Sequence, residues 1–125
     1  MAESITNATT KSKVIIDALG FSVVDEQEKI VHVTWSQVQA IYGYKRFINQ
    51  VGTLCLDFRL PNDDDGNEQV IIVEEGAQGW SMLKVKLEHV FPSLDTRWSD
   101  KASAGTVALG KIVPKYISNL TEVWK

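Results

Sequence analysis

The amino-acid sequence predicts an α+β fold, in which an antiparallel β-sheet or roll of five to seven strands carries one main amphipathic helix at about residues 78–91. The clearest observation is the strict alternation over residues 53–60, where every second residue is apolar and faces a core. Such alternation is typical of antiparallel sheets, because strands buried on both faces lose it. The second observation is that apolar residues over 78–91 recur at three- and four-residue steps, the period of a helix.

The first part of the chain divides into short strands separated by polar turns. Residues 13–19 and 21–24 predict two strands on either side of Gly20. Residues 29–34 predict a third strand, which follows the polar turn at residues 25–28. Segments of this length and spacing are typical of a meander.

The middle of the chain continues this pattern. Residues 35–41 are ambiguous and include a single helical turn for which Ser36 is the expected cap. A strand over residues 41–47 precedes the alternating strand, and residues 61–67 are almost all turn formers and predict a hairpin loop. Residues 69–73 are apolar on both faces, so their strand is expected at the centre of the sheet.

The predicted helix is followed by a region of weaker patterns. The apolar stripe of the helix consists of Trp80, Leu83, Leu87, Val90 and Phe91. Pro92 cannot continue the helix, and residues 97–108 predict a second one around Trp98. Residues 120–124 predict a closing strand that adds to its own sheet or to that of a second copy. Addition to its own sheet is the favoured interpretation, because most closing strands serve their own core, and a homodimer through a sheet edge or this C-terminal strand is the alternative.

The length of 125 residues predicts one globular domain over residues 13–125, preceded by a flexible N-terminus at residues 1–12. The apolar share of 44% and charged share of 23% are ordinary for a globular protein. A single cysteine, Cys55, excludes an internal disulfide and a cysteine zinc site and is typical of a reducing compartment. Neither a signal peptide nor an apolar run of membrane-spanning length is present, so a cytoplasmic location without membrane contact is predicted.

The net charge of −3 is unevenly distributed along the chain. Residues 57–75 carry seven acidic residues and one arginine, which gives −6 for that segment. No segment is basic enough to bind nucleic acid through its phosphates. The acidic segment also disfavours attraction to an anionic membrane.

The sequence contains no catalytic motif, cofactor motif or metal-binding motif. Cys55 and His32 are the residues from which a nucleophile and a base could be assembled, if their strands were neighbours. The run Asp63, Asp64 and Asp65 lacks the ligand order of a calcium loop, and a solvated hairpin tip is the simpler interpretation. The protein is therefore expected to be no enzyme and to need no cofactor.

Residues 42–46 are the one stretch with a pattern typical of a binding surface, because aromatic and basic side chains interleave on one strand. Tyr and Arg are enriched at interface anchors. The candidate binding residues are Tyr42, Tyr44, Lys45 and Arg46. In the alternative interpretation both tyrosines pack under the helix, while the basic residues are solvated.

The segment Val33-Thr34-Trp35-Ser36-Gln37-Val38, followed by Ile41 and later by one amphipathic helix, resembles small bacterial domains with a pleckstrin-homology-like fold. The chain is also similar to uncharacterised bacterial proteins with a Trp-Ser-x-Val and Tyr-Lys-Arg pattern. The resemblance covers about residues 13–91 and implies a roll of strands closed by the helix. The chain departs from the family after Pro92 and lacks its basic lipid-binding cluster, so phosphoinositide binding is not implied.

Three functions remain as hypotheses. The first is a non-catalytic cytosolic binding module that engages a protein partner. The second is a small acidic immunity-type protein that neutralises a basic toxin by charge complementarity. Its acidic face consists of Asp63, Asp64, Asp65 and Glu68. The third is a thiol hydrolase that uses Cys55 with His32.

Overall fold

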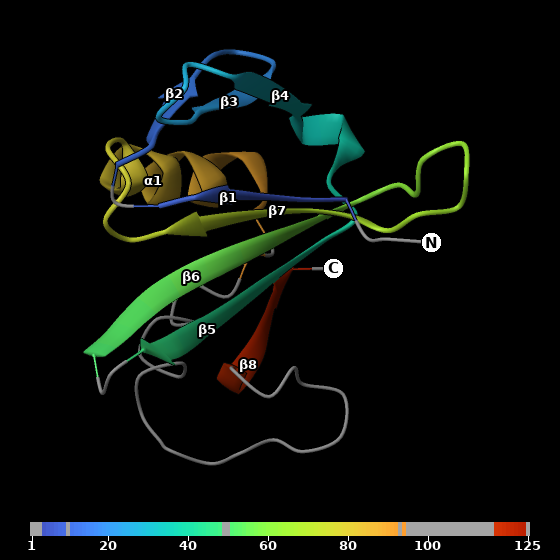
Figure 1. Cartoon of the computed structure of the whole chain (residues 1–125). Coiled ribbons are helices and arrows are strands. Elements are labelled where there is room, and N and C mark those ends of the chain that lie inside the picture. The colour runs from blue at the N-terminus through green and yellow to red at the C-terminus, as the bar shows by residue number, and fades with distance from the viewer. Residues whose placement is uncertain (1–3, 10, 49–50, 93, 95–116, 125) are drawn as a thin grey trace.

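The computed structural model describes residues 4–9, 11–48, 51–92, 94 and 117–124, which form two β-sheets and one α-helix (Figure 1). The α+β class predicted from the sequence is confirmed. The strands divide between a five-stranded and a three-stranded sheet, whereas a single sheet or roll was predicted. The predicted second helix at residues 97–108 lies outside the described residues.

The larger sheet has the strand order β1-β7-β6-β5-β8. Its strands are β1 (Ser4–Ala8), β5 (Ala40–Ile48), β6 (Val51–Leu60), β7 (Gln69–Glu74) and β8 (Ile117–Trp124). Consecutive strands β5, β6 and β7 pair antiparallel, as the alternating pattern predicted. The sheet is nevertheless mixed, because β1 lies parallel to β7, with Ser4 opposite Gln69. The prediction of an all-antiparallel sheet is wrong at this one pair, which joins segments far apart in the sequence.

Two predictions about the chain ends are decided by this sheet. Residues 1–12 were expected to be a flexible terminus, but Ser4–Ala8 is a strand that hydrogen-bonds along β7. Its polar sequence gives no strand signal of its own, and Ala8 is fully buried against the core. At the other end, β8 pairs antiparallel with β5 of its own chain. Own-chain addition was one of the two alternatives for the closing strand.

The smaller sheet has the order β2-β3-β4 and lies above the larger one in Figure 1. It is an antiparallel meander of β2 (Lys13–Ile16), β3 (Gly20–Val24) and β4 (Ile30–Thr34). The outer edge of β2 bonds to the loop before the helix, where Val14 N donates to Gln78 O at 2.7 Å. A short 3₁₀ turn, η1 (Trp35–Gln37), leads from β4 toward the larger sheet. Thr34 rather than Ser36 is its N-cap, because the Gln37 side chain accepts a hydrogen bond from Thr34 N at 3.0 Å.

The helix α1 (Trp80–Val90) follows β7 and confirms the predicted helix with slightly shorter bounds. Its stripe of Trp80, Leu83 and Leu87 is buried in a core shared with both sheets. Aromatic contacts join the two sheets across this core, with the ring centroids of Phe21 and Phe58 4.9 Å apart. Because Leu56 and Phe58 belong to the same core, α1 and the smaller sheet cover one face of the larger sheet.

Gly79 is the N-cap residue of α1 and lies against β2 of the smaller sheet. Its φ is positive, at 94°. A Cβ at this position would lie 2.3 Å from Val14 O. Gly66 in the hairpin loop also has a positive φ, of 81°, but a Cβ there would meet nothing within 4 Å. A substitution at Gly66 therefore tests backbone strain alone, whereas a substitution at Gly79 tests backbone strain together with steric overlap.

We predict that Gly79→Ala lowers the free energy of unfolding more than Gly66→Ala does. The alanine at Gly66 incurs only left-handed strain, about 1–2 kcal/mol. The alanine at Gly79 must also push Val14 away, which adds about 1–3 kcal/mol. Urea denaturation of both variants measures the difference. Equal losses would show that the contact between Gly79 and β2 does not constrain the fold.

Candidate functional site

A connected group of polar side chains lies on the face of the larger sheet that is turned away from α1. Alternation places Ile41, Leu56 and Phe58 in the core under the helix. The residues between them therefore point to the opposite face, where Tyr44 and Cys55 form a second buried cluster with Val70 and Ile72. The polar group on this face consists of Tyr42, Tyr44, Arg46, Asp57, Arg59, Glu68 and Glu74, and we call it the sheet polar network.

The centre of the sheet polar network is the contact between Tyr44 and Asp57. Tyr44 is 0% exposed, Asp57 is 3% exposed, and the Tyr44 hydroxyl donates to Asp57 Oδ1 at 2.8 Å. Burial raises the pKa of the Asp57 carboxyl, and the hydrogen bond from Tyr44 and the charge of Arg59 oppose that rise. The same burial and the neighbouring carboxylate raise the pKa of Tyr44, which keeps its hydroxyl protonated as a donor.

Arg59 links this centre to the hairpin loop. Its Nη2 lies 3.3 Å from Asp57 Oδ2, and its Nη1 donates to Glu68 at the end of the loop. The guanidinium also lies over the ring of Tyr42, 5.3 Å from the ring centroid. Through Arg59, the aromatic strand and the acidic loop, which were predicted as separate sites, belong to one network. Asp57 and Arg59 were not predicted as site residues, although both lie on the polar side of the alternating strand.

The four predicted binding residues are not brought together on one exposed surface. Tyr44 is buried, and Tyr42 is half-buried beneath Arg59. Arg46 pairs with the largely buried Glu74, with 3.1 Å between Nη2 and Oε1. Lys45 points to the other face of the sheet, because its neighbours in the strand alternate with it. The alternative in which the tyrosines pack under the helix is also wrong for Tyr44, whose cluster lies on the opposite face.

Cys55 and His32 do not form a catalytic pair. Cys55 lies on β6 of the larger sheet and is fully buried, and its burial raises the pKa of the thiol to about 12. The thiol is therefore protonated at neutral pH and a poor nucleophile. His32 lies on β4 of the other sheet, where Nε2 is 3.2 Å from Asp17 Oδ2. This geometry removes the structural basis of the thiol-hydrolase hypothesis.

The acidic loop between β6 and β7 is ordered by its own first aspartate. Asp63 accepts backbone hydrogen bonds from Asn67 N at 2.8 Å and Asp65 N at 2.9 Å. These bonds lower the pKa of the Asp63 carboxyl, and the bond from Asn67 N has the largest effect. Asp64 and Asp65 are exposed at the tip, as a solvated hairpin requires. The described residues contain no group of three or more His, Cys, Asp or Glu side chains placed to hold a metal ion.

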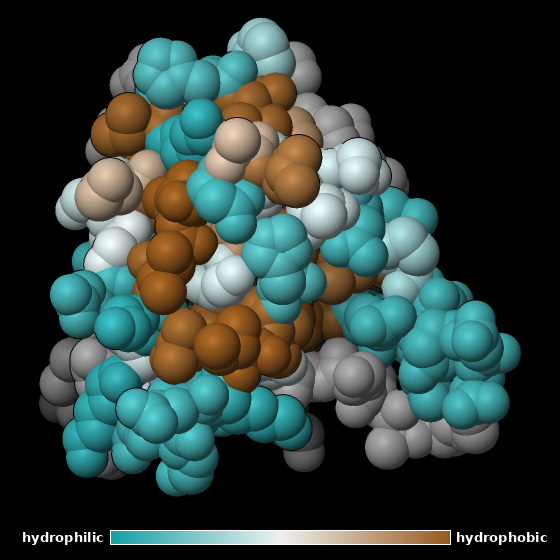
Figure 2. Space-filling model, turned by 90° about the horizontal axis from the view of Figure 1, so that it is seen from above, coloured by the Kyte–Doolittle hydropathy of each residue, from teal (hydrophilic) through white to brown (hydrophobic). Residues whose placement is uncertain are grey.

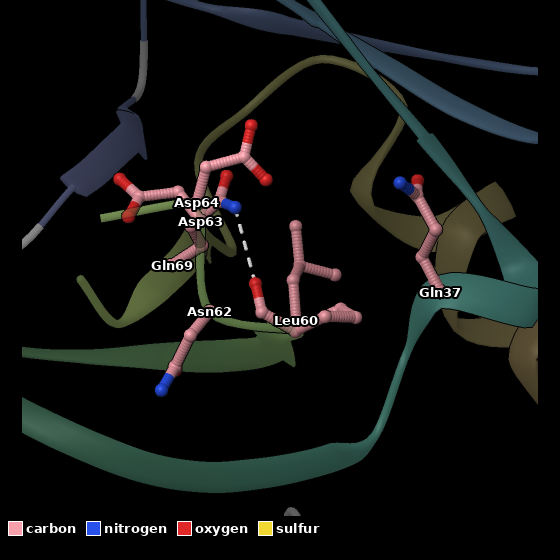
Figure 3. A pocket seen from close by; sticks show the side chains of 7 residues that line it. Gln37, Leu60, Asn62, Asp63, Asp64 and Gln69 are labelled. Atoms are coloured by element: carbon pink, nitrogen blue, oxygen red, sulfur yellow. Dashed lines mark hydrogen bonds between the residues drawn. The ribbon is translucent and has the colours of Figure 1, made fainter. Parts of the chain in front are cut away.

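A shallow pocket of about 340 Å³ lies at the base of this loop, between the hairpin and η1 (Figure 3). It is lined by Gln37, Leu60, Pro61, Asn62, Asp63, Asp64 and Gln69. The Gln69 side chain donates to Pro61 O at 3.1 Å and so closes the loop on itself. Of the amides that line the pocket, Gln69 is thus used to fix the loop, and Gln37 accepts from Thr34 N at the start of η1.

An exposed apolar surface was not predicted from the sequence. Ile15 is 50% exposed, Leu19 72% and Ile30 64%, and all three belong to the smaller sheet or its first turn. Seen from above, apolar side chains gather over this sheet and are surrounded by hydrophilic ones (Figure 2). We call these three residues the sheet apolar patch. The sequence did contain a signal for it, the run Val14-Ile15-Ile16, which is apolar on both faces of its strand. Only one face of that strand covers the core, so an apolar side chain on the other face is left exposed.

Comparison with protein-family models, with curated proteins and with solved structures finds no match for this chain. Among the residues that the structure describes, no helix has the length and apolar character needed to cross a bilayer.

We predict that Asp57→Asn changes how stability depends on pH. The pKa of Asp57 is raised in the folded state, so this group favours folding most below its ordinary pKa of 3.8. That contribution is lost as pH rises from about 3.8 through the raised folded pKa, because the buried carboxyl must then ionise. Urea denaturation of both proteins from pH 3 to 8 should show wild-type stability falling relative to the variant over this window. Parallel profiles would show that Asp57 titrates as an exposed carboxyl does.

Proposed function

We propose that this protein is a non-catalytic module that binds a protein partner through the sheet apolar patch. The observation that carries the proposal is the exposure of three large aliphatic side chains, Ile15, Leu19 and Ile30, on one small sheet and its first turn. Exposed apolar surface that is rimmed by polar residues is typical of protein interaction sites. Covering it removes apolar area from water at about 25 cal/mol per Å².

The surroundings of the patch favour a specific contact. The smaller sheet is anchored beneath by Phe21, Val23 and Val33, which are buried in the main core. The exposed side chains are therefore presented by a fixed backbone, which lowers the ordering cost of binding. Lys13 and the Asp17–His32 pair lie on the same sheet or its turn and are exposed. They provide the polar rim that such interfaces usually have.

We also propose that the fold is a variant of the pleckstrin-homology-like arrangement. What supports this is the succession of two three-stranded meanders, β2-β3-β4 and β5-β6-β7, followed by α1. The parallel strand β1 and the added strand β8 are departures from the implied roll. Such folds serve many activities, so the proposed function depends on the patch and not on this likeness.

We predict that Ile15→Ser with Leu19→Ser abolishes partner capture. Both side chains are exposed, so their loss removes contact area with little effect on the core. The measurement is crosslinking in the native cell followed by mass spectrometry of the captured proteins. The matched control is Met82→Ser with Val85→Ser, which removes two exposed apolar side chains from α1. A partner lost only in the first variant supports the proposal, and equal capture by wild type and both variants contradicts it.

A second candidate function is neutralisation of a basic toxin by the acidic loop. The observation that favours it is the exposure of Asp64 and Asp65 on a loop that Asp63 and Asn67 hold in one conformation. A rigid, negatively charged projection can occupy the basic cleft of a nuclease by charge complementarity. In this role Glu68 is a poor contact residue, because it is already paired with Arg59.

We predict for this second function that Asp64→Lys with Asp65→Lys removes protection against the toxin. The measurement is growth of cells that co-express the protein with a basic nuclease toxin encoded beside its gene. Glu26→Lys with Lys29→Glu serves as a control, because it alters exposed charges in the turn before β4. Full protection by the Asp64 and Asp65 variant would exclude this loop as the neutralising face.

A further inference from the structure

The strand β4 forms an edge of the smaller sheet. Among the described residues, β3 is the only strand that pairs with it. The opposite edge of this sheet is blocked at the start of β2, where Val14 N donates to Gln78 O and Gln78 N donates to Ser12 O. Edge strands are usually protected by charged residues, proline or a bulge. β4 reads Ile-Val-His-Val-Thr, contains none of these, and pairs with β3 in continuous register.

The direction in which the backbone groups of β4 point follows from a hydrogen bond just after the strand ends. Trp35 N donates to Leu19 O, on the β3 side. Backbone groups alternate along an antiparallel strand, so those of Val31 and Val33 also face β3. The groups of Ile30, His32 and Thr34 consequently face the open edge. Thr34 N is already bonded to the Gln37 side chain, and this leaves both backbone groups of Ile30 and of His32 to be paired.

We propose that β4 pairs antiparallel with β4 of a second copy of this chain, on a two-fold axis at Val31. This register places Ile30 of one copy opposite His32 of the other, twice. Each of these pairs exchanges two backbone hydrogen bonds, so all the open groups of Ile30 and His32 are satisfied. A register centred on His32 would instead require Thr34 N, which Gln37 occupies.

The side chains of β4 fit a copy of themselves. On the outer face, Ile30 and His32 are exposed and would lie side by side across the axis. On the inner face, the half-buried Val31 would contact Val31 of the other copy and extend the core. No charged residue opposes a like charge in this register between Ile30 and His32. The partner is therefore specified by self-complementarity, as a two-fold interface requires.

The proposed interface is small, because it involves only residues 30–32 of each copy. The dimer therefore belongs to the weak, concentration-dependent class of interfaces. It joins two three-stranded sheets into one six-stranded sheet and places two sheet apolar patches on one continuous surface. The inference does not rest on the proposed function, since it is argued from the open backbone groups of Ile30 and His32. Of the patch residues only Ile30 takes part in the pairing, and Ile15 and Leu19 lie outside it. Binding of a partner and formation of the dimer can thus fail separately.

The test is analytical ultracentrifugation of the full chain over a wide range of concentrations. Wild type is expected to show a monomer–dimer equilibrium. Ile30→Lys with His32→Lys places like charges opposite each other at both pairs and should weaken the dimer by at least about tenfold. Ile30→Glu with His32→Lys instead creates two Glu–Lys pairs across the axis and should dimerise within about threefold of wild type. Circular dichroism confirms that each variant is folded.

The control is Ile15→Lys with Leu19→Lys, which adds the same charges at the two patch residues that do not lie on the β4 edge, and it should leave the dimer unchanged. A wild type that stays monomeric at every concentration overturns the proposal. A dimer that survives Ile30→Lys with His32→Lys, or that the control abolishes, places the interface elsewhere. Loss of the dimer in the Glu–Lys variant overturns the pairing centred on Val31.

Discussion

The burial of β6 on both of its faces is the constraint on which the structure depends. One face contributes Phe58 to the core under α1, and the other buries Asp57, a residue that is only 3% exposed. A buried carboxylate is costly unless donors replace the lost water. Tyr44 from β5 and Arg59 from β6 itself supply those donors. The contact from Tyr44 crosses between the strands and so depends on the observed pairing of β5 with β6. A shift by one residue would exchange the core and polar faces along the whole hairpin.

The parts of the fold that depend on local patterns were predictable from the sequence. The helix and the alternating strand each carry a period that few other structures satisfy, and both were found nearly at their observed bounds. β1 was missed because Ser4–Ala8 is polar and becomes a strand only through its pairing with β7. The division into two sheets was also not predictable, because the β3–β4 turn and the η1 turn look alike as breaks in a strand pattern.

At the candidate site, the alternation of residues along a strand predicted which side chains share a face but not whether that face is exposed. The pattern correctly separates Tyr44 and Arg46 from their neighbours, but it does not say whether their face meets solvent. Burial turned Tyr44 from an expected contact residue into a donor for Asp57. The exposed apolar residues escaped notice for the converse reason, since an isoleucine in a short strand is assumed to face a core. In both cases the missing information was which sheet face is covered, and that is a property of the tertiary structure.

The parallel pairing of β1 with β7 has a consequence for how the chain acquires its structure during synthesis. Ser4 lies opposite Gln69, so 65 residues must follow Ser4 before its partner exists. At a translation rate of roughly 5–20 residues per second, the N-terminal segment waits for several seconds outside any sheet. β2, β3 and β4 are synthesised in this interval and can pair with one another, because their contacts are local. The order of folding is therefore not the order of synthesis: β1 is synthesised before β2, β3 and β4 but can be placed only once β7 exists, and until then it is accessible to chaperones and proteases.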